Sequence, residues 1–429
     1  MRIRLLFLLL LTVGTSDATF LSRRSESLIR TANNAGRHVI KRSAGLAHNL
    51  RLAYNGLRIQ QQPGSAKMYC VNLPSNATGL TGGGGGGAAV SSSTVSQSGG
   101  GSTVTAPAPS PSGSANVSSP WKVAQSYQGS TFFDGWDFTN AADVTTDGIA
   151  QYIDQNTAQS ANIIEINSAG NAVMRVETTP QVTGNRQSIR ITTQYSYTGG
   201  LIILDAVHMP TGCGTWPAFW SNGPNWPVGG EIDMVEGVND YTNNQATLHT
   251  DVGCTMPSSD PAALNITGTL IGTTDCSAAD TGNAGCGIRA SQTNSFGAAF
   301  NDINGGVYAT LWDNAGISVF FFPRSAIPAD ITADAPQPST WGQPMANFPA
   351  STCSPFKFFY NHTAIFDTTL CGVWAGAVWS AAGVPGQDQS CAQRTGVATC
   401  EDFVRSNGTA FSEAYWEVAS VKIYQMSSD

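Results

Sequence analysis

Three carboxylates within six residues, at Glu231, Asp233 and Glu236, constrain the fold of this chain more than any other feature. The residues between the acids are apolar, which predicts a β-strand whose side chains alternate between two faces. Glu231 and Asp233 would then share one face, and Glu236 would lie on the other. One extra residue, a β-bulge at the apolar pair Met234-Val235, reverses that parity. The sequence therefore predicts three carboxylates in one row on one sheet.

Like charges on one face repel, so a chemical role is a good reason to gather them. Glycoside hydrolysis needs two carboxyl groups: one with a raised pKa protonates the leaving oxygen, and the other attacks the sugar carbon or activates water. A solvated strand face and a calcium site built of oxygen ligands are alternatives. Aromatic residues lie just upstream, at 214–220 and Trp226. They favour carbohydrate, because aromatic rings stack on sugar faces.

The segment Glu-Ile-Asp-Met-Val-Glu (231–236) resembles the bulged signature of glycoside hydrolase family 16. The resemblance covers residues 120–429, is most specific at 205–250, and includes Trp-Pro-Ala-Phe-Trp (216–220). Within that family, the chain is similar to the secreted fungal laminarinase-type endo-1,3(4)-β-glucanases. The resemblance implies a β-jelly-roll sandwich of two antiparallel sheets with a concave substrate cleft. The implied activity is retaining endo-hydrolysis of β-1,3-glucan, with mixed β-1,3/1,4- and β-1,3/1,6-glucans as further substrates.

The family motif also implies a role for each acid. By position, Glu231 is the nucleophile, Glu236 the acid/base, and Asp233 the helper that holds their protonation states apart. Two glutamates leaning together from one bulged strand suit the separation of roughly 5–5.5 Å that gives retention. Trp220 and Trp226 match aromatic residues of the family's cleft and are the expected sugar-stacking platforms.

The other candidate residues have structural alternatives. Trp216 is a further substrate-binding candidate, but Trp216 and Trp220 are also suited to packing between two sheets. His249 is expected on the strand beside the acids, near one end of their row, and a cleft histidine is implied there. A histidine on a strand is also commonly structural. The same two alternatives are open for His208. His362 lies inside an Asn-His-Thr sequon and is expected to be exposed.

Several function classes are open or excluded. A cell-wall glucan transglycosylase on the same fold and a non-catalytic glucan-binding protein are the alternatives to a hydrolase. The sequence has no Gly-x-Ser-x-Gly motif, which argues against a serine hydrolase. No metal ligand set is legible, so no cofactor is expected to be required, although a structural calcium would suit such a sandwich. The expected partner is β-glucan polysaccharide, bound by a monomer without a membrane span.

Composition divides the chain into four segments. Residues 1–19 combine early arginines, an apolar run and a small residue at Ala18, which predicts a secretory signal peptide and an extracellular protein, with cell-wall association as an option. Residues 20–62 form a basic amphipathic segment, favoured as a propeptide. The alternatives are a helix that binds a membrane surface or the cell wall, and a segment that pairs electrostatically with the acidic body. Residues 63–119 are a Gly/Ser/Pro-rich linker expected to be disordered. Residues 120–429 are the expected catalytic domain.

The charge of the chain is unevenly distributed. Residues 1–119 hold 11 of the 21 Lys and Arg but 2 of the 29 Asp and Glu, which leaves a net charge of −17 on the rest. Such an acidic body argues against binding to nucleic acid or anionic lipid.

Residues 120–429 contain short apolar or alternating segments separated by Gly, Asn, Asp and Pro, which predicts an all-β sandwich. The expected strands are 163–166, 172–176, 188–193, 200–206, 231–236, 246–250, 306–312, 318–322, 356–360 and 415–424.

Eight cysteines follow the linker and predict up to four disulfides, formed in an oxidising compartment. Short separations favour the pairs Cys276–Cys286 and Cys391–Cys400. Sequons for N-glycosylation occur at Asn76, Asn116, Asn265, Asn361 and Asn407.

Overall fold

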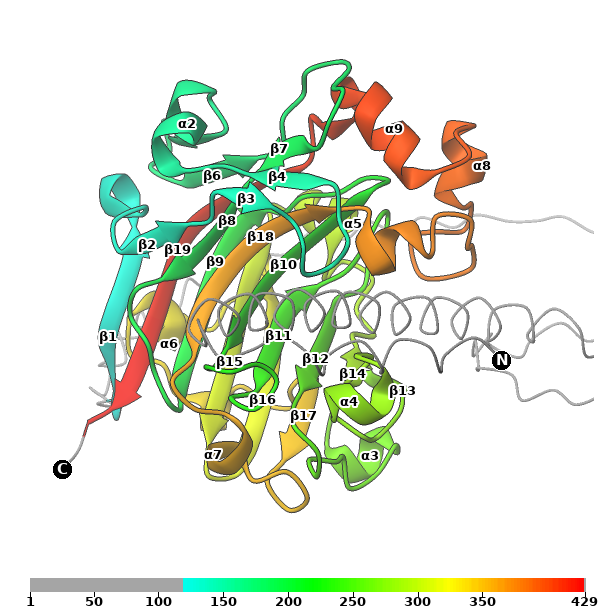
Figure 1. Cartoon of the computed structure of the whole chain (residues 1–429). Coiled ribbons are helices and arrows are strands. Elements are labelled where there is room, and N and C mark those ends of the chain that lie inside the picture. Colours follow the sequence, from blue (N-terminus) through cyan, green and yellow to red (C-terminus); the bar gives the residue numbers. More distant parts are fainter. Residues whose placement is uncertain (1–118, 428–429) are drawn as a thin grey trace, which may run out of the picture. The chain divides into compact units, whose positions relative to one another are not determined.

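The computed structural model describes residues 119–427. The predicted signal peptide (1–19), the basic segment (20–62) and all but the last residue of the linker (63–119) lie outside the described residues. The described part is built of two large β-sheets, with short helices at their edges (Figure 1). The prediction of an all-β sandwich is confirmed.

Both large sheets are antiparallel throughout. Sheet A has the order β17-β16-β15-β9-β19-β6-β5, with β1 also paired to β19. Its strands are β1 (Trp121–Gln128), β5 (Ile164–Ile166), β6 (Ala172–Arg175), β9 (Gly200–His208), β15 (Gly306–Asp313), β16 (Gly316–Pro323), β17 (Ala346–Pro349) and β19 (Tyr415–Met426).

Sheet B has the order β13-β14-β12-β11-β10-β18-β8-β2 and carries the acidic stretch on a central strand, β11. Its strands are β2 (Trp136–Phe138), β8 (Arg190–Thr193), β10 (Thr215–Asn222), β11 (Glu231–Glu236), β12 (Gln245–His249), β13 (Thr269–Gly272), β14 (Cys286–Arg289) and β18 (Thr363–Leu370). A small third sheet contains β3 (Ala141–Ala142), β4 (Ala150–Tyr152) and β7 (Arg186–Ser188).

The helices of the described part of the chain are short, and the longest α-helix there has seven residues. The α-helices are α2 (Gln155–Ser160), α3 (Pro261–Leu264), α4 (Ala278–Thr281), α5 (Gly297–Asn301), α6 (Ala329–Thr332), α7 (Pro355–Phe358), α8 (Cys391–Thr395) and α9 (Cys400–Ser406). Single turns of 3-10 or π-helix are η1 (Gly129–Thr131), η2 (Arg324–Ala326), η3 (Pro338–Thr340), η4 (Gly372–Gly376) and η5 (Gly408–Phe411). Within residues 119–427, none of the helices has the length and hydropathy needed to span a bilayer.

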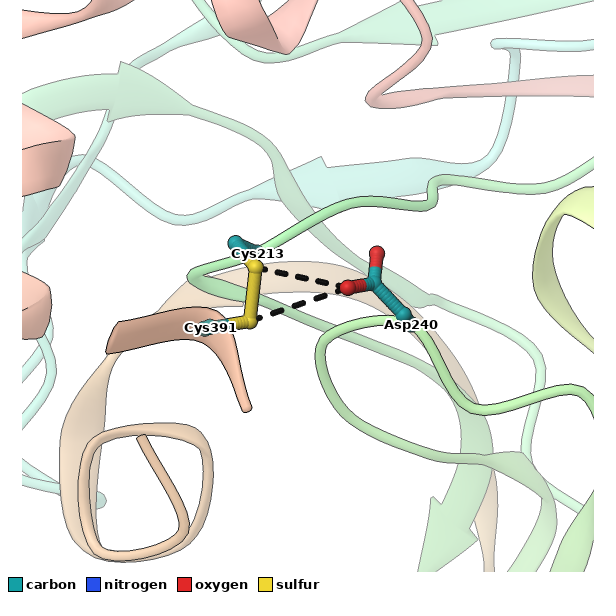
Figure 2. A group of neighbouring side chains, drawn as sticks. All are labelled: Cys213, Asp240 and Cys391. Atoms are coloured by element: carbon teal, nitrogen blue, oxygen red, sulfur yellow. Dashed lines mark hydrogen bonds between the residues drawn. A yellow bond between two sulfur atoms is a disulfide. The ribbon is translucent and has the colours of Figure 1, made fainter. Parts of the chain in front are cut away.

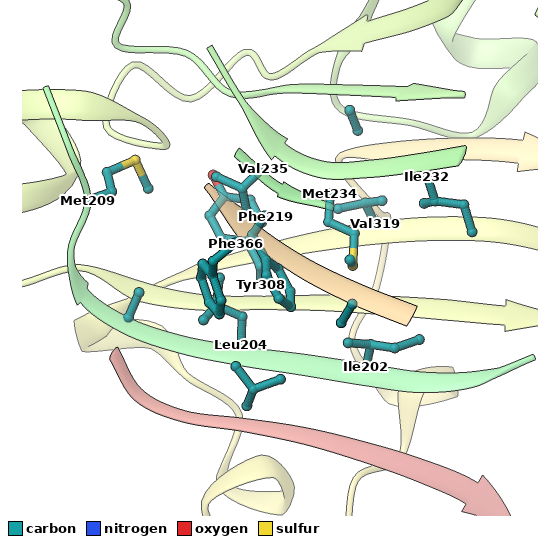
Figure 3. Close-up of a cluster of buried hydrophobic side chains, with 14 of the residues drawn as sticks. Ile202, Leu204, Met209, Phe219, Ile232, Met234, Val235, Tyr308, Val319 and Phe366 are labelled. Carbon is teal, nitrogen blue, oxygen red and sulfur yellow. The ribbon is translucent and has the colours of Figure 1, made fainter. Parts of the chain in front are cut away.

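The main core fills the space between the two large sheets. Figure 3 shows side chains from β9, β15 and β16 of sheet A meeting side chains from β10, β11 and β18 of sheet B. Phe219 and Phe366 pack with ring centroids 4.5 Å apart on neighbouring strands of sheet B. Trp136 of β2 is buried in this cluster.

Sheet A is covered on both faces, whereas sheet B is not. The outward residues of β9, such as Leu201 and Ile203, form a second apolar cluster with Ile331 and Trp341. Two buried faces explain why β9 reads as a nearly continuous apolar run. The outer face of sheet B carries polar and aromatic side chains instead, and it is the face on which the acids lie.

All eight cysteines of the described residues form disulfides, which confirms the expected number. The pair Cys276–Cys286 was predicted correctly, but Cys391–Cys400 was wrong. Although they are close in sequence, the cysteines that begin α8 and α9 are bonded separately to the ends of two adjacent strands of sheet B. The other three bonds are Cys213–Cys391, Cys371–Cys400 and Cys254–Cys353.

The predicted strand at 356–360 is also wrong. Residues Pro355–Phe358 form helix α7, which begins with proline at its first turn, where a missing N–H costs nothing. The strand follows instead at β18, which pairs with β10 and β8. The aromatic composition of 356–360 serves packing: Phe358 and Phe359 are buried in the core.

Candidate active site

The predicted bulge is present in β11. Asp233 pairs with Thr247 of β12 and Glu236 with Gln245, so three steps along β11 match two along its partner. Met234 and Val235 are both buried and point between the sheets (Figure 3). The parity is therefore reversed, and all three carboxylates lie in one row on the outer face of sheet B.

Glycines bracket this strand because aromatic rings lie close to the backbone. Gly230 has φ +78°, and a Cβ there would lie 2.3 Å from the Phe359 ring. A Cβ on Gly237 would lie 2.7 Å from the ring of Phe296. The Gly-Glu and Glu-Gly steps at the two ends of the motif thus let the core pack tightly behind the two glutamates.

The flanking strands place the predicted aromatic residues beside the acids. On β10, Asn222 pairs with Glu231, Trp220 with Asp233, and Ala218 with Glu236. Trp216 lies two residues further along β10 on the same face. Both tryptophans are half-buried on the face of the acids, and Trp216 also packs against the main core cluster.

Each glutamate accepts a hydrogen bond from a tryptophan indole. Trp216 Nε1 donates to Glu236 Oε1 at 2.8 Å. Trp226 Nε1 donates to Glu231 Oε2, and Trp226 is 44% exposed. One tryptophan therefore orients each carboxyl group.

His249 lies opposite Glu231 on β12, as expected for one end of the row. Its Nε2 is 3.3 Å from Oδ2 of Asp233, so the imidazole faces the middle acid. All seven predicted site residues thus gather on β10, β11, β12 and the loop that precedes β11.

Two residues that no sequence pattern indicated extend the row towards β8. Asp367 of β18 accepts a hydrogen bond from Trp220 Nε1 at 3.3 Å. Arg190 of β8 lies 3.9 Å from the Asp367 carboxylate, and its guanidinium stacks over the Trp220 ring at 5.0 Å. They lie more than 100 residues apart in sequence and come together only through the strand order of sheet B.

The histidine expected to be exposed, His362, is fully buried, and that expectation is wrong. Its Nε2 lies 2.9 Å from the Gly229 carbonyl, and its Nδ1 lies 2.9 Å from Ser221 Oγ. A carbonyl only accepts, so Nε2 carries the proton and Nδ1 accepts from the hydroxyl. Burial lowers the pKa of His362 to about 4. The neighbouring Asn361 of the same sequon is exposed.

The pKa of all three acids is raised, chiefly by burial. Burial and then the charge of Asp233 raise the pKa of Glu231 to about 8, while His249 and the Trp226 hydrogen bond act in the opposite direction. Burial and Asp233 raise the pKa of Glu236 well above its ordinary value, against the Trp216 hydrogen bond. Burial is also the main cause that raises the pKa of Asp233. Because the three interact, protons leave the row one after another.

Two groups within residues 119–427 bring three potential metal ligands within 4.8 Å of one another. One is Glu231, Asp233 and His249, which belongs to the row. The other is Cys213, Asp240 and Cys391 (Figure 2), but its two sulfurs are bonded to each other and offer no thiolate. Neither is the all-oxygen set that Ca²⁺ prefers, so the structural calcium stays an expectation.

The raised pKa of Asp233 predicts that replacing this carboxyl increases the stability of the fold in a pH-dependent way. The pKa of this carboxyl is raised from 3.8 to about 8, so folding binds a proton that the unfolded chain has lost in this window. Its contribution to stability therefore falls as the pH rises from about 4 to about 8. We expect Asp233→Asn to raise Tm at pH 7.5 by roughly 2–4 °C, the equivalent of about 1 kcal/mol, and to change it little at pH 4.

Thermal unfolding followed by circular dichroism at both pH values measures this difference. Asp388→Asn, at an exposed position, is the matched control and should leave Tm unchanged at either pH. A lower Tm for Asp233→Asn at pH 7.5 would mean that the neighbours of Asp233 hold it as a stabilising anion.

Comparison with protein families matches residues 136–424 to the XgeA-like, catalytic GH16 domain. The chain belongs to glycoside hydrolase family 16. It is thus a glycoside hydrolase, and the resemblance drawn from residues 231–236 is confirmed.

Curated relatives agree with this family. The chain is 44% identical over 308 residues to the probable glycosidase C21B10.07 of Schizosaccharomyces pombe, covering 71% of this chain and 69% of that protein. It is 40% identical over 312 residues to the probable endo-1,3(4)-beta-glucanase ACLA_073210 of Aspergillus clavatus, covering 72% of this chain. The match spans about half, 47%, of the Aspergillus protein's length.

Solved structures of the same family show the same architecture. Laminarinase 16A from Phanerochaete chrysosporium, solved with 6-O-glucosyl-laminaritriose in donor and acceptor sites, has 36% identity and a TM-score of 0.64. An elongating GH family 16 beta-1,3-glucosyltransferase has 38% identity and the same TM-score. Each match covers 71% of this chain, with 99% of the laminarinase and 100% of the transferase. The family-16 jelly-roll fold is therefore that of this chain.

Proposed function

We propose that this family-16 hydrolase is a secreted, retaining endo-β-glucanase acting on β-1,3-glucan, with mixed-linkage glucans as further substrates. The observation that carries the proposal is the bulge in β11, which puts Glu231 and Glu236 on one face with Asp233 between them. Two carboxyl groups flanking a bond from one side of a sheet suit double displacement.

In the first step, Glu231 attacks the anomeric carbon while Glu236 donates a proton to the glycosidic oxygen. The C–O bond to the leaving sugar breaks, and a covalent glycosyl-enzyme forms on Glu231. In the second step Glu236, now ionised, takes a proton from water, which attacks the anomeric carbon and releases Glu231.

The electrostatics of the row support this division of roles. Glu231 receives the Trp226 N–H and lies near His249 and Arg190, which all favour its anion. Burial and Asp233 raise the pKa of Glu236 well above its ordinary value, which favours its protonated form. A nucleophile needs the charged form and a general acid needs the protonated form.

The aromatic residues supply surfaces for sugar rings. Trp226 is 44% exposed beside Glu231, and an exposed indole beside the acids offers an apolar surface to a sugar ring. Trp220 lies over the neighbouring position of the row, held by Arg190 and Asp367. We assign Trp226 and Trp220 to sugar stacking.

Secretion is part of the proposal. The apolar leader at residues 1–19 and the sequons at exposed Asn265 and Asn361 support it. Four disulfides in the described residues fit an oxidising compartment. Mass spectrometry of the protein recovered from culture medium would detect loss of residues 1–19 and attached glycans.

Glucan transglycosylation is a second candidate, favoured by the similarity to the elongating β-1,3-glucosyltransferase. Both reactions share the glycosyl-enzyme and differ in whether water or a sugar hydroxyl accepts the glycosyl group. Glucanase activity predicts shorter products and new reducing ends, whereas transfer predicts longer products at constant reducing ends.

Incubation with laminarin, lichenan and a galactan, with reducing-sugar and chain-length analysis, tests the proposal. We expect shortened products from laminarin, and ¹H NMR should detect the β-anomer first. Glucan binding without bond cleavage would favour a non-catalytic protein, and an α-anomer formed first would exclude retention.

A further inference from the structure

The bulge in β11 interrupts the backbone hydrogen bonding between this strand and its neighbour. An extra residue disrupts the ladder of backbone hydrogen bonds, and groups beside it lose their strand partners. Here the bulged residues Met234 and Val235 are 1% and 0% exposed, so water does not replace those bonds. Buried backbone groups are nearly always paired, and leaving them unpaired is costly.

One side chain bonds both sides of the bulge. Asn244, which precedes β12, is fully buried. Its Nδ2 donates to the Met234 carbonyl at 2.9 Å, and its Oδ1 accepts from the backbone N–H of Glu236 at 3.0 Å. The amide thus closes the gap across the extra residue, directly at the backbone of Glu236.

The amide is itself held rigidly. The backbone N–H of Asn244 donates to Ser295 Oγ at 2.9 Å, and its carbonyl accepts from Ala290 N–H at 2.8 Å. Met345 Sδ lies 3.8 Å from Nδ2. The amide has one possible orientation, because a flip would put its NH₂ against an N–H and its oxygen against a carbonyl.

We propose that Asn244 is a positioning residue for catalysis, which locks the bulge and so directs the Glu236 carboxyl towards the glycosidic oxygen. This inference rests on the proposed acid/base role of Glu236. Geometry supports it because Oδ1 fixes the Glu236 backbone on one side while Trp216 fixes its carboxyl on the other. An ångström of displacement at a catalytic group is enough to slow a reaction about 100-fold.

The test compares two substrates in the full-length protein with Asn244→Ala. The leaving sugar of laminarin needs the proton from Glu236, whereas 2,4-dinitrophenol leaves without one. We expect kcat/KM for laminarin to fall roughly 100-fold. For 2,4-dinitrophenyl β-laminaribioside, kcat/KM should change by less than about threefold, since it reports attack by Glu231. An equal loss on both substrates would overturn the positioning role.

Asn243→Ala is the matched control. Asn243 is the adjacent residue, 5% exposed, and its Nδ2 donates to the Ala290 carbonyl at 2.8 Å rather than to β11. Asn243→Ala removes a buried amide of the same size and should leave the ratio of the two kcat/KM values at the wild-type level. If Asn243→Ala shifts that ratio as much as Asn244→Ala does, a general loosening explains the effect and the proposal fails.

Asn244→Asp keeps the proposal testable if the alanine variant does not fold. In this variant, the protonated carboxyl group can accept from Glu236 N–H and donate to the Met234 carbonyl, whereas the carboxylate anion can only accept. The nearest ionisable groups on the flanking strands are Glu236 and Arg289, which both pair with Gln245, the residue after Asn244. Glu231 and Asp233 lie further along β11. We expect laminarin activity relative to wild type to be highest at acid pH and to fall as the pH rises. A ratio independent of pH would contradict the proposed role.

These outcomes are distinguishable from a failure of the proposed function. Wild type and Glu236→Ala are measured on the same two substrates. If kcat/KM of Glu236→Ala falls equally on both substrates, the acid/base role is wrong. If it loses laminarin selectively while Asn244→Ala does not, the role stands and the inference about Asn244 is overturned.

Discussion

Replacing Glu231 by glutamine should lower kcat on laminarin about 10⁴-fold or more, because the reaction loses its nucleophile. The amide has the size of the carboxyl group and an oxygen that still accepts the Trp226 N–H, but it does not attack the anomeric carbon. Since burial raises the pKa of Glu231, removal of its charge should not lower Tm at neutral pH. Reducing-sugar release and thermal unfolding measure the two effects.

Glu165→Gln is the matched control, because Glu165 is an exposed residue of sheet A that pairs with Arg175. It should retain wild-type turnover. Glu231→Gly provides a chemical check with the dinitrophenyl glycoside and azide: azide filling the vacated space should attack from the nucleophile's side and give the α-glycosyl azide. Near-normal turnover by Glu231→Gln would remove this residue from the mechanism.

The row of acids could be predicted because its cause is local. A strand alternates with a period of two, and acids at 231, 233 and 236 fit one face only if one residue is extra. The adjacent apolar residues Met234 and Val235 mark the bulge because both have to be buried. The same reasoning placed His249 opposite the row, since the next strand pairs with this one.

The parts of the site that the sequence did not reveal depend on strand order. Asp367 and Arg190 reach Trp220 because β18 and β8 follow β10 in sheet B, which no local pattern encodes. In the sequence Asn244 resembles a turn residue. Its role becomes visible only in the structure, where its amide bonds the two backbone groups that the bulge leaves without strand partners. The sequon predicts an exposed position for His362, but only Asn361 is exposed, and the next side chain along the chain is buried.

Cysteine pairing has the same limit. The pair Cys276–Cys286 closes a short segment that contains helix α4, so sequence separation predicts it. Cys391 and Cys400 are equally close but begin two helices, each of which is tied to a different strand end. Proximity along the chain is informative only where no longer-range contact competes.

Replacing Glu236 by alanine should separate the two steps of the reaction. On laminarin, loss of the general acid should lower kcat/KM by roughly 10²–10⁴-fold. On 2,4-dinitrophenyl β-laminaribioside the first step needs no proton, so Glu231 should still form the glycosyl-enzyme. Its hydrolysis needs Glu236 as a base and should be slow. We therefore expect a burst of dinitrophenol equal to the enzyme concentration, followed by a slow steady state.

Azide and pH then distinguish an acid/base from any other essential carboxyl group. Azide needs no general base, so it should accelerate the steady state of Glu236→Ala and give the β-glycosyl azide, opposite in configuration to the Glu231→Gly product. Burial and Asp233 raise the pKa of Glu236, so wild-type kcat/KM should fall on the basic side as this proton is lost. In Glu236→Ala that basic limb should disappear. A variant with neither a burst nor azide rescue would show that Glu236 serves the nucleophile rather than the leaving group.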